Sequence, residues 1–291
     1  MLSAGRAMRR ARESGQPLPE IPALKELYGG YFKFRARGGQ VTMIAGQPGS
    51  LKSALALFWA ERCHVPGIYF SADMAAHTAM TRLAASSTGE TIDSVSSALA
   101  DGHEDYYSEV VQNSMLKFCF DPNPSSDTFQ GELNAWVEAY DNYPRIIVID
   151  NLLDVVPDSG DNEFSGYKAV LLEVKTLARV TGAAVFILHH MSETGTDPNK
   201  PAPRKSIQGK VSQTPENVIS VALNEDTGEF LLSVVKHRSG PQSPTASRVV
   251  ALRALPDRNQ FVPWKPDPVP SMAVPLEGQS NVTHYSRKDI D

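Results

Sequence analysis

GQPGSLKS, which runs from Gly46 to Ser53, is the stretch of this chain that decides its fold. The apolar run 41–45 before it is typical of a buried strand, and residues 54–60 after it favour a helix. A glycine-rich turn between a strand and a helix, closed by a lysine and a hydroxyl residue, is the context of a phosphate-binding P-loop. The N–H groups of such a loop and the N-terminus of the helix favour phosphate oxygens, and the lysine adds positive charge.

Leu51 departs from the P-loop pattern, which has glycine at this position. Leucine keeps the backbone N–H, but its side chain adds bulk and restricts the backbone beside the phosphate. We expect reduced affinity rather than lost chemistry, and the alternative is an ordinary Gly-Pro turn. The expected cofactor-binding residues are Gly46, Gln47, Pro48, Gly49, Ser50, Leu51, Lys52 and Ser53, with the Ser53 hydroxyl also a ligand for Mg²⁺.

The composition allows a substantial core, because 41% of the 291 residues are hydrophobic, and we favour one α/β domain. A net charge of −5 gives no overall attraction to nucleic acid, so polyanion binding would depend on local basic patches. Cys63 and Cys119 lack metal-site spacing and are expected to be reduced thiols in a cytoplasmic protein. The sequence has no signal peptide pattern and no apolar run near the ~20 residues of a membrane-spanning helix.

Three parts of the chain are predicted. Residues 1–20 form a basic N-terminal arm, residues 21–262 form the folded domain, and residues 263–291 form a Pro-rich tail that is extended or disordered. Helical patterns separate the early strands, which builds a mainly parallel sheet flanked by helices, with an antiparallel strand pair at its C-terminal end. The predicted strands are 41–45, 67–71, 116–120, 145–149, 183–188, 217–223, 230–235 and 248–254.

Two carboxylates follow predicted strands at the edge where open α/β sheets bind ligands. Asp150 ends the apolar run RIIVID and is the expected partner for Mg²⁺ through water. Asp73 follows the strand 67–71 and is the candidate general base that activates water. For each aspartate, the alternative is a structural cap at the start of the next helix.

Paired histidines end the strand 183–188. A neutral imidazole at this edge can sense the terminal phosphate, which is the role we expect for His190. A metal site is the less favoured alternative, since His189 and His190 are adjacent on a strand and point to opposite faces. A structural histidine remains a third interpretation.

The segment KHRSGP, residues 236–241, follows the strand 230–235. Lys236 and Arg238 alternate along the strand end and therefore share one side. Such a pair can stabilise charge on a transferring phosphoryl group, and a neighbouring subunit can supply it as an arginine finger. A solvated face of an edge strand is the alternative.

A long polar segment, residues 193–213, lies between the histidines and the next strand. Its cations lie downstream of the expected phosphate sensor, so we infer a contact with a nucleic-acid backbone that depends on nucleotide state. A mobile solvated loop is the alternative, and the acidic loop 157–166 is not a phosphate clamp. The candidate nucleic-acid residues are Lys200, Arg204, Lys205 and Lys210.

Taken in order, GQPGSLKS, the strand before Asp73 with RLAAS at 82–86, RIIVID, FILHH and KHRSGP resemble the ATPase core of RecA/DnaB-like hexameric helicases. The resemblance spans about residues 20–262 and implies a RecA-like P-loop NTPase core. It is similar to phage- or plasmid-type members, which lack the N-terminal primase-binding domain. Aspartate at 73 replaces the commoner glutamate of the family, and His190 replaces the glutamine that often senses the γ-phosphate.

The resemblance implies a homo-oligomer, most often a hexameric ring, with ATP and Mg²⁺ between subunits. Asp73 then polarises the attacking water, and Lys236 with Arg238 completes the site of the neighbouring subunit. The loops after Asp150 and His190 line a pore that holds single-stranded DNA, in the cytosol of a bacterium or of a phage-infected host.

We therefore expect an ATP-dependent, ring-forming DNA motor that acts in replication or recombination. A second hypothesis is a DNA nuclease on the same scaffold, in which Asp73, Asp150, Asp154 and the histidines hold Mn²⁺ or Mg²⁺. A third is a weak or inactive ATPase that serves as a DNA-loading or recombination scaffold, for which Leu51 and Asp73 would be the marks of decay.

Overall fold

A nine-stranded sheet forms the centre of the computed structural model, which describes residues 8, 15–158 and 163–264. The strand order is β3-β2-β4-β5-β1-β6-β7-β8-β9, parallel from β3 to β6 and antiparallel from β6 to β9. The strands are β1 (Val41–Gly46), β2 (Gly67–Ser71), β3 (Leu116–Cys119), β4 (Ile146–Asp150), β5 (Ala184–His190), β6 (Asn217–Asn224), β7 (Glu229–His237), β8 (Val250–Leu255) and β9 (Gln260–Pro263). All eight predicted strands are present, and the expected mainly parallel α/β fold is confirmed.

Helices connect the parallel strands. They are α2 (Lys25–Gly29), α3 (Lys52–Arg62), α4 (Ala76–Thr88), α5 (Ile92–Ala100), α6 (Glu104–Gln112), α7 (Ser126–Tyr140) and α8 (Glu163–Thr181). Short 3-10 turns lie at η1 (Pro22–Leu24), η2 (Leu152–Asp154), η3 (Arg204–Ser206), η4 (Gln208–Gln213) and η5 (Pro256–Arg258). No helix in the described part of the chain is long and apolar enough to cross a membrane.

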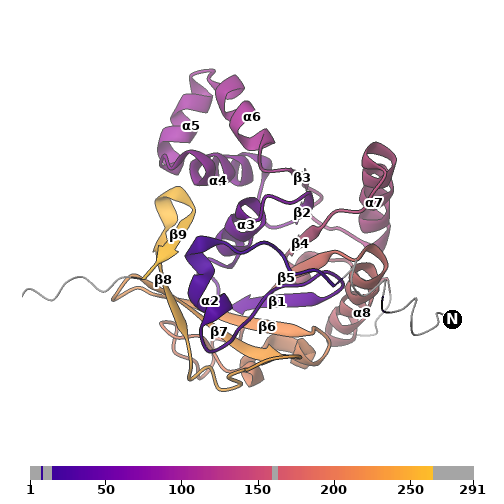
Figure 1. Ribbon diagram of the computed structural model, residues 1–291, viewed down its shortest axis with the longest axis vertical. Coiled ribbons are helices and arrows are strands. Elements are labelled where there is room, and N and C mark those ends of the chain that lie inside the picture. Colours follow the sequence, from indigo (N-terminus) through magenta and orange to yellow (C-terminus); the bar gives the residue numbers. More distant parts are fainter. Residues whose placement is uncertain (1–7, 9–14, 159–162, 265–291) are drawn as a thin grey trace, which may run out of the picture.

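The two faces of the sheet bury different helices. On one face, Trp59 of α3 packs against Phe34 and Phe186, in a core that also includes α2. On the other face, α7 and α8 cover the sheet, with Phe129 and Val174 in the core. Successive strand residues alternate between the faces, so the central strands are apolar along their whole length. Figure 1 shows α3 in the middle of the molecule and α7 beside α8 at one side.

Helices α4, α5 and α6 form a separate group that stands above α3 in Figure 1. The buried carboxylate of Glu61 on α3 joins this group to the core, because it accepts hydrogen bonds from Ser86 Oγ at 2.6 Å and Ser87 Oγ at 2.9 Å. The position of α4 relative to α3 is therefore fixed by buried hydrogen bonds as well as by apolar packing.

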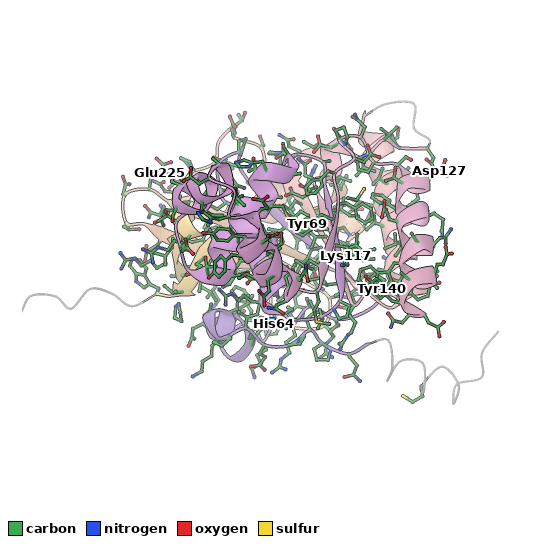
Figure 2. The ribbon with its side chains drawn as sticks, turned by 90° about the horizontal axis from the view of Figure 1, so that it is seen from above. His64, Tyr69, Lys117, Asp127, Tyr140 and Glu225 are labelled. Carbon is green, nitrogen blue, oxygen red and sulfur yellow. The ribbon has the colours of Figure 1, made fainter. Side chains whose placement is uncertain are left out.

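The N-terminal and C-terminal parts lie mostly outside the described residues. Residues 15–20 lie against the domain, where the N–H of Leu18 donates to Ala36 O at 2.9 Å and the Leu18 side chain is buried. The rest of the predicted basic arm, except Met8, and the predicted tail from residue 265 are not described. At the sheet ends, Lys117 of β3 and Tyr140 of α7 lie together, away from Glu225 in the β6–β7 turn (Figure 2).

Candidate active site

A cleft of ≈ 610 Å³ lies at the C-terminal ends of the parallel strands. The strand register explains why the predicted residues meet there, since Gly46 lies opposite His190 and Ser71 lies opposite Asp150. The residues that line the cleft are Pro48, Gly49, Ser50, Leu51, Lys52, Ser53, Ala54, Asp73, Met74, Ala75, Thr78, Arg82, Asp150, Asn151 and His190.

The loop between β1 and α3 has the backbone shape that its sequence requires. Gly49 has a φ of 77° and open space where a side chain would be, so its N–H is accessible. A Cβ at Gly46 would clash with Ser50 Oγ and approach Val221 O to 2.9 Å. Ser50 Oγ is buried without a hydrogen-bond partner among the described residues. An unpaired hydroxyl inside a glycine-rich loop fits a loop built to receive an acceptor.

Leu51, the departure from the P-loop pattern, is the N-cap residue of α3 and has left-handed backbone angles, with φ 59° and ψ 28°. Glycine adopts this conformation without strain, whereas a leucine there costs about 1–2 kcal/mol. The side chain packs partly against the core and partly lines the cleft. The backbone therefore keeps the P-loop path despite the substitution.

The ammonium of Lys52 is buried and donates to Gln47 O at 2.8 Å, within its own loop. Burial lowers the pKa of Lys52 to about 8, and Asp150 and Asp73 offset part of this effect. A buried cation whose hydrogen-bond partner is a neutral carbonyl is poorly compensated, so an anionic ligand in the cleft would stabilise it.

Asp150 is held at the end of β4 by two donors. Ser53 Oγ lies 3.1 Å from one carboxylate oxygen, and the hydroxyl of Tyr69 lies 2.8 Å from the other. Burial raises the pKa of Asp150 to about 6, while these two hydrogen bonds act in the opposite direction. Tyr69 lies in the middle of the molecule (Figure 2). A hydroxyl beside a buried carboxylate is the donor set that Mg²⁺ prefers, so these residues fit the metal that the P-loop implies.

Asp73 and His190 both line this cleft. The side chain of Asp73 is exposed, and its N–H donates to Asp150 O at 3.3 Å, which joins the ends of β2 and β4. Burial and then the charge of Lys52 lower the pKa of His190, so its imidazole is neutral at pH 7. His189 points away from the cleft, where its Nε2 donates to Gln208 O at 3.1 Å. The predicted opposite orientation of the two rings is thus confirmed.

Four further side chains of the cleft were not predicted from the sequence. Arg82 reaches the cleft from α4, where its guanidinium contacts Met74 Sδ at 3.1 Å. Thr78, four residues before Arg82, lies on the same helix face, and Asn151 follows Asp150 directly. The helical spacing after Asp73 was the available signal for Thr78 and Arg82.

The segment after His190 is tied to the P-loop. Gln47 Nε2 donates to Thr196 Oγ1 at 2.6 Å, and the N–H of Met191 donates to Gly46 O at 3.1 Å. The candidate nucleic-acid residues are placed further along the segment. Lys200 is exposed and pairs with Asp197 at 3.0 Å, Arg204 and Lys205 lie in η3, and the side chain of Lys210 lies outside the described residues.

Lys236 and Arg238 lie outside this cleft, at the end of β7. The Lys236 ammonium donates to Ser212 O, Gln213 O and Pro215 O of its own chain. The Arg238 side chain is 61% exposed, with a contact of 3.4 Å to the buried carboxylate of Glu216. Neither cation therefore joins the nucleotide cleft of its own subunit.

Asp154 lies in η2, and its carboxylate accepts from the N–H of Asn151 at 3.4 Å. Among residues 8, 15–158 and 163–264, no three His, Cys, Asp or Glu side chains come together as a metal site. The geometry thus gives the nuclease hypothesis no support of its own.

Comparisons with known proteins agree with this architecture. A family model described as an AAA domain matches residues 6–196. The Gene 65 protein of Mycobacterium phage L5 is 30% identical over 254 residues, which are 85% of this chain and 93% of that protein. A solved DnaB-like replicative helicase, studied for its interactions with primase, has a TM-score of 0.73 at 16% identity and covers 91% of this chain and 68% of its own. A second solved structure, of an isolated ATPase domain, has a TM-score of 0.73 at 17% identity and covers 90% and 99%. These structures confirm the predicted RecA/DnaB-like core as a fold.

Proposed function

This chain belongs to the AAA domain family, and we propose that it is an ATP-hydrolysing motor of the DnaB helicase type that acts on single-stranded DNA as a ring. The observation that supports the proposal most directly is the convergence of Lys52, Ser53 and Asp150 in one cleft, with Ser53 hydrogen-bonded to Asp150. A lysine, a hydroxyl and a strand-end carboxylate are the groups that hold a nucleotide triphosphate with its metal.

The cofactors that fit are ATP with Mg²⁺, or alternatively Mn²⁺. Ser53 and Asp150 would hold the metal, Asp150 through water, and the N–H groups of residues 46–53 with Lys52 would hold the phosphates. The bound metal neutralises charge on the phosphate oxygens. Its positive charge would also stabilise the ionised form of Asp150, whose pKa is raised in the absence of a cation.

Three side chains have distinct roles in hydrolysis. Asp73 is the general base: its exposed carboxylate accepts the proton of a water that attacks the terminal phosphate. Lys52 stabilises charge on the phosphate oxygens. His190 is neutral and hydrogen-bonds to the terminal phosphate through its imidazole, and the direct link from Gln47 to Thr196 passes the state of the P-loop to the segment 191–213.

The ring is proposed because the chain presents an arginine that does not reach its own cleft. Lys52, Asp73 and Asp150 line the cleft, while Arg238 lies exposed on a different edge of the same chain. A second copy placed with Arg238 against the first cleft adds a cation to the site, and repetition of this head-to-tail contact closes a ring. A hexamer is the number that we propose, by likeness to the DnaB-type fold.

Single-stranded DNA is the proposed polymer, with the segment 191–213 as its contact through Lys200, Arg204, Lys205 and Lys210. A backbone contact of this kind is electrostatic and independent of base sequence. Because Thr196 of the segment contacts Gln47 of the P-loop, DNA contact and nucleotide state are linked through one hydrogen bond.

ATP hydrolysis by the purified full-length chain, with and without oligo(dT), tests the proposal. We expect Mg²⁺-dependent hydrolysis that rises severalfold with oligo(dT), and none by Lys52→Ala prepared in the same way. End-labelled DNA incubated with Mn²⁺ but no ATP is expected to keep its length. Hydrolysis equal to that of Lys52→Ala would favour the inactive scaffold, and shortened DNA would favour the nuclease.

A further inference from the structure

The ammonium group of Lys236 is fully engaged by its own chain. It donates to the backbone carbonyls of Ser212 at 2.9 Å, Gln213 at 2.8 Å and Pro215 at 2.6 Å. An ammonium has three N–H donors and no acceptor, so these carbonyls use its whole capacity. Contact with a phosphate of a neighbouring subunit would require Lys236 to leave all three carbonyls.

A second lysine completes the arrangement. Lys175 of α8 donates to Thr214 O at 3.2 Å and pairs with Glu216 at 3.1 Å. Four consecutive backbone carbonyls, those of residues 212–215, are therefore bound by two lysines from two different elements. We call residues 212–215 and their two lysines the carbonyl clamp. Charge-assisted bonds to backbone carbonyls are stronger than neutral ones, so the clamp fixes the path of this segment.

The clamp lies where the segment 191–213 ends and β6 begins. The other end of that segment is bound to the P-loop by the Gln47–Thr196 hydrogen bond and by the bond from Met191 N to Gly46 O. His189 also holds Gln208 O, at the first residue of η4. The segment is thus anchored to the nucleotide cleft at its start and to β7 at its end.

Lys236 is two residues before Arg238 on the same chain end, and β7 is paired on both sides with β6 and β8. A paired strand moves as a unit more readily than it deforms. A shift of residues 212–215 would therefore move Lys236 and, with it, the guanidinium of Arg238. Arg238 can follow such a shift because its side chain is exposed and its contact with Glu216 is long, at 3.4 Å.

We propose that Lys236 is a positioning residue that couples the segment 191–213 to Arg238, rather than a second cation that contacts phosphate. This assignment rests on the proposed function, in which Arg238 acts on the cleft of the next subunit and the segment contacts DNA. It replaces the role in trans that the Lys-x-Arg spacing predicts for Lys236. DNA contact would then adjust the arginine through the clamp.

The surroundings of Lys236 agree with a structural ammonium. Burial lowers the pKa of Lys236 to about 8, and the positive charges of Arg204, Lys175 and Arg238 add to this effect while Glu216 opposes it. A group surrounded by cations is held there by its three carbonyls and not by a carboxylate. Arginine cannot replace it easily, because a planar guanidinium does not match three carbonyls that converge on one point.

Hydrogen–deuterium exchange of the full-length protein, without ATP or DNA, tests the clamp itself. We expect Lys236→Met and Lys236→Arg to speed amide exchange at residues 208–218 by at least about tenfold, because the segment loses its anchor. Lys117→Met, an exposed lysine on β3 at the opposite edge of the sheet, is the control and is expected to leave these residues unchanged. Unchanged exchange in both Lys236 variants would overturn the proposal.

ATP hydrolysis with and without oligo(dT) tests the coupling. We expect Lys236→Met to keep the DNA-free rate within about threefold of wild type but to lose its stimulation by DNA, whereas Arg238→Ala lowers both rates. Equal loss of both rates in Lys236→Met, with activity restored by Lys236→Arg, would assign Lys236 to the phosphate and overturn the proposal. A wild-type protein that hydrolyses no ATP would overturn the proposed function and the coupling with it, while the exchange measurement would still decide the clamp.

Discussion

Two lysines of this chain have the same pKa, about 8, and opposite freedom. Lys52 lies in the nucleotide cleft with a carbonyl partner in its own loop, so donors remain available to a ligand. Lys236 lies at the end of β7 with three carbonyl partners and has no donor to spare. A depressed lysine pKa thus reports burial alone, whereas the number of bound acceptors separates a ligand-binding lysine from a structural one.

The cleft and the β7 edge differ in the same sense. In the cleft, Lys52, Ser53 and Asp150 come from one subunit and form a set that can hold phosphate and metal. At the edge, Lys175, Arg179 and Arg238 surround the carboxylate of Glu216, so cations outnumber it. In our proposal, one region is a nearly complete site, and the other is a contribution to a neighbour's site.

The largest expected effects separate binding from chemistry. Lys52→Ala should lower kcat and weaken ATP binding together, because Lys52 contacts the phosphates in the ground state and in the transition state. Arg238→Ala should lower kcat by about 10³-fold while ATP affinity stays within about threefold, because an arginine finger acts mainly on the transition state. Steady-state hydrolysis and titration with a fluorescent ATP analogue measure the two quantities.

Arg179→Ala is the matched control, since Arg179 lies at the same edge but 3.9 Å from Glu216. Its kcat should stay within about threefold of wild type. An Arg238→Ala protein that loses ATP binding as completely as Lys52→Ala would contradict the division between the two regions.

A smaller effect is expected on stability. Asp150 titrates near pH 6 in the folded protein and near 3.8 in the unfolded chain, because burial disfavours its charged form. The folded state binds more protons between these values, so the contribution of Asp150 to the free energy of unfolding falls as the pH rises through about 6, by at most about 3 kcal/mol. Asp150→Asn should therefore raise the unfolding temperature of the nucleotide-free protein at neutral pH by about 2–4 °C, with loss of hydrolysis.

Thermal unfolding at several pH values checks this prediction. The gain from Asp150→Asn should shrink toward pH 4, where the wild-type carboxyl is already protonated. Asp73→Asn removes an exposed carboxylate of the same cleft and should change the unfolding temperature by less than about 1 °C. An Asp150→Asn protein that is less stable at neutral pH would show that the carboxylate is compensated within the empty cleft.

The smallest effect is expected at Leu51. Leu51→Gly removes a side chain from the cleft and relieves a left-handed φ of 59°, so ATP should bind about two- to fivefold more tightly. Leu51→Ala removes most of the bulk but keeps the backbone strain, and the difference between the two variants separates these causes. Weaker ATP binding by both variants would mean that the leucine side chain supports the loop.

The cleft could be predicted from the sequence better than the edge, for a physical reason. Parallel strands end at one side of a sheet, so strand-end residues such as Asp150 and His190 meet there whatever the details of packing. Strand β9 escaped prediction because it has four residues and ends in Pro263. The three carbonyls around Lys236 belong to backbone 21 to 24 residues away, and no side-chain pattern encodes them.

Arg82 and Thr196 were missed for related reasons. Arg82 enters the cleft from a helix that is fixed by the packing of Glu61 against α4. Thr196 reaches Gln47 across 149 positions of sequence, through the path of a loop without regular structure. Tertiary placement of this kind follows from the folded core and not from local periodicity.

A mixture of Lys52→Ala and Arg238→Ala subunits tests the central claim, that a nucleotide cleft is completed by the arginine of the next subunit. Each variant alone should be inactive. After subunits exchange, which native mass spectrometry can verify, an equal mixture should recover about one quarter of the wild-type rate, since random rings contain that share of intact pairs. Mixed rings that hydrolyse no ATP, or a monomer that hydrolyses it at the full rate, would contradict the account.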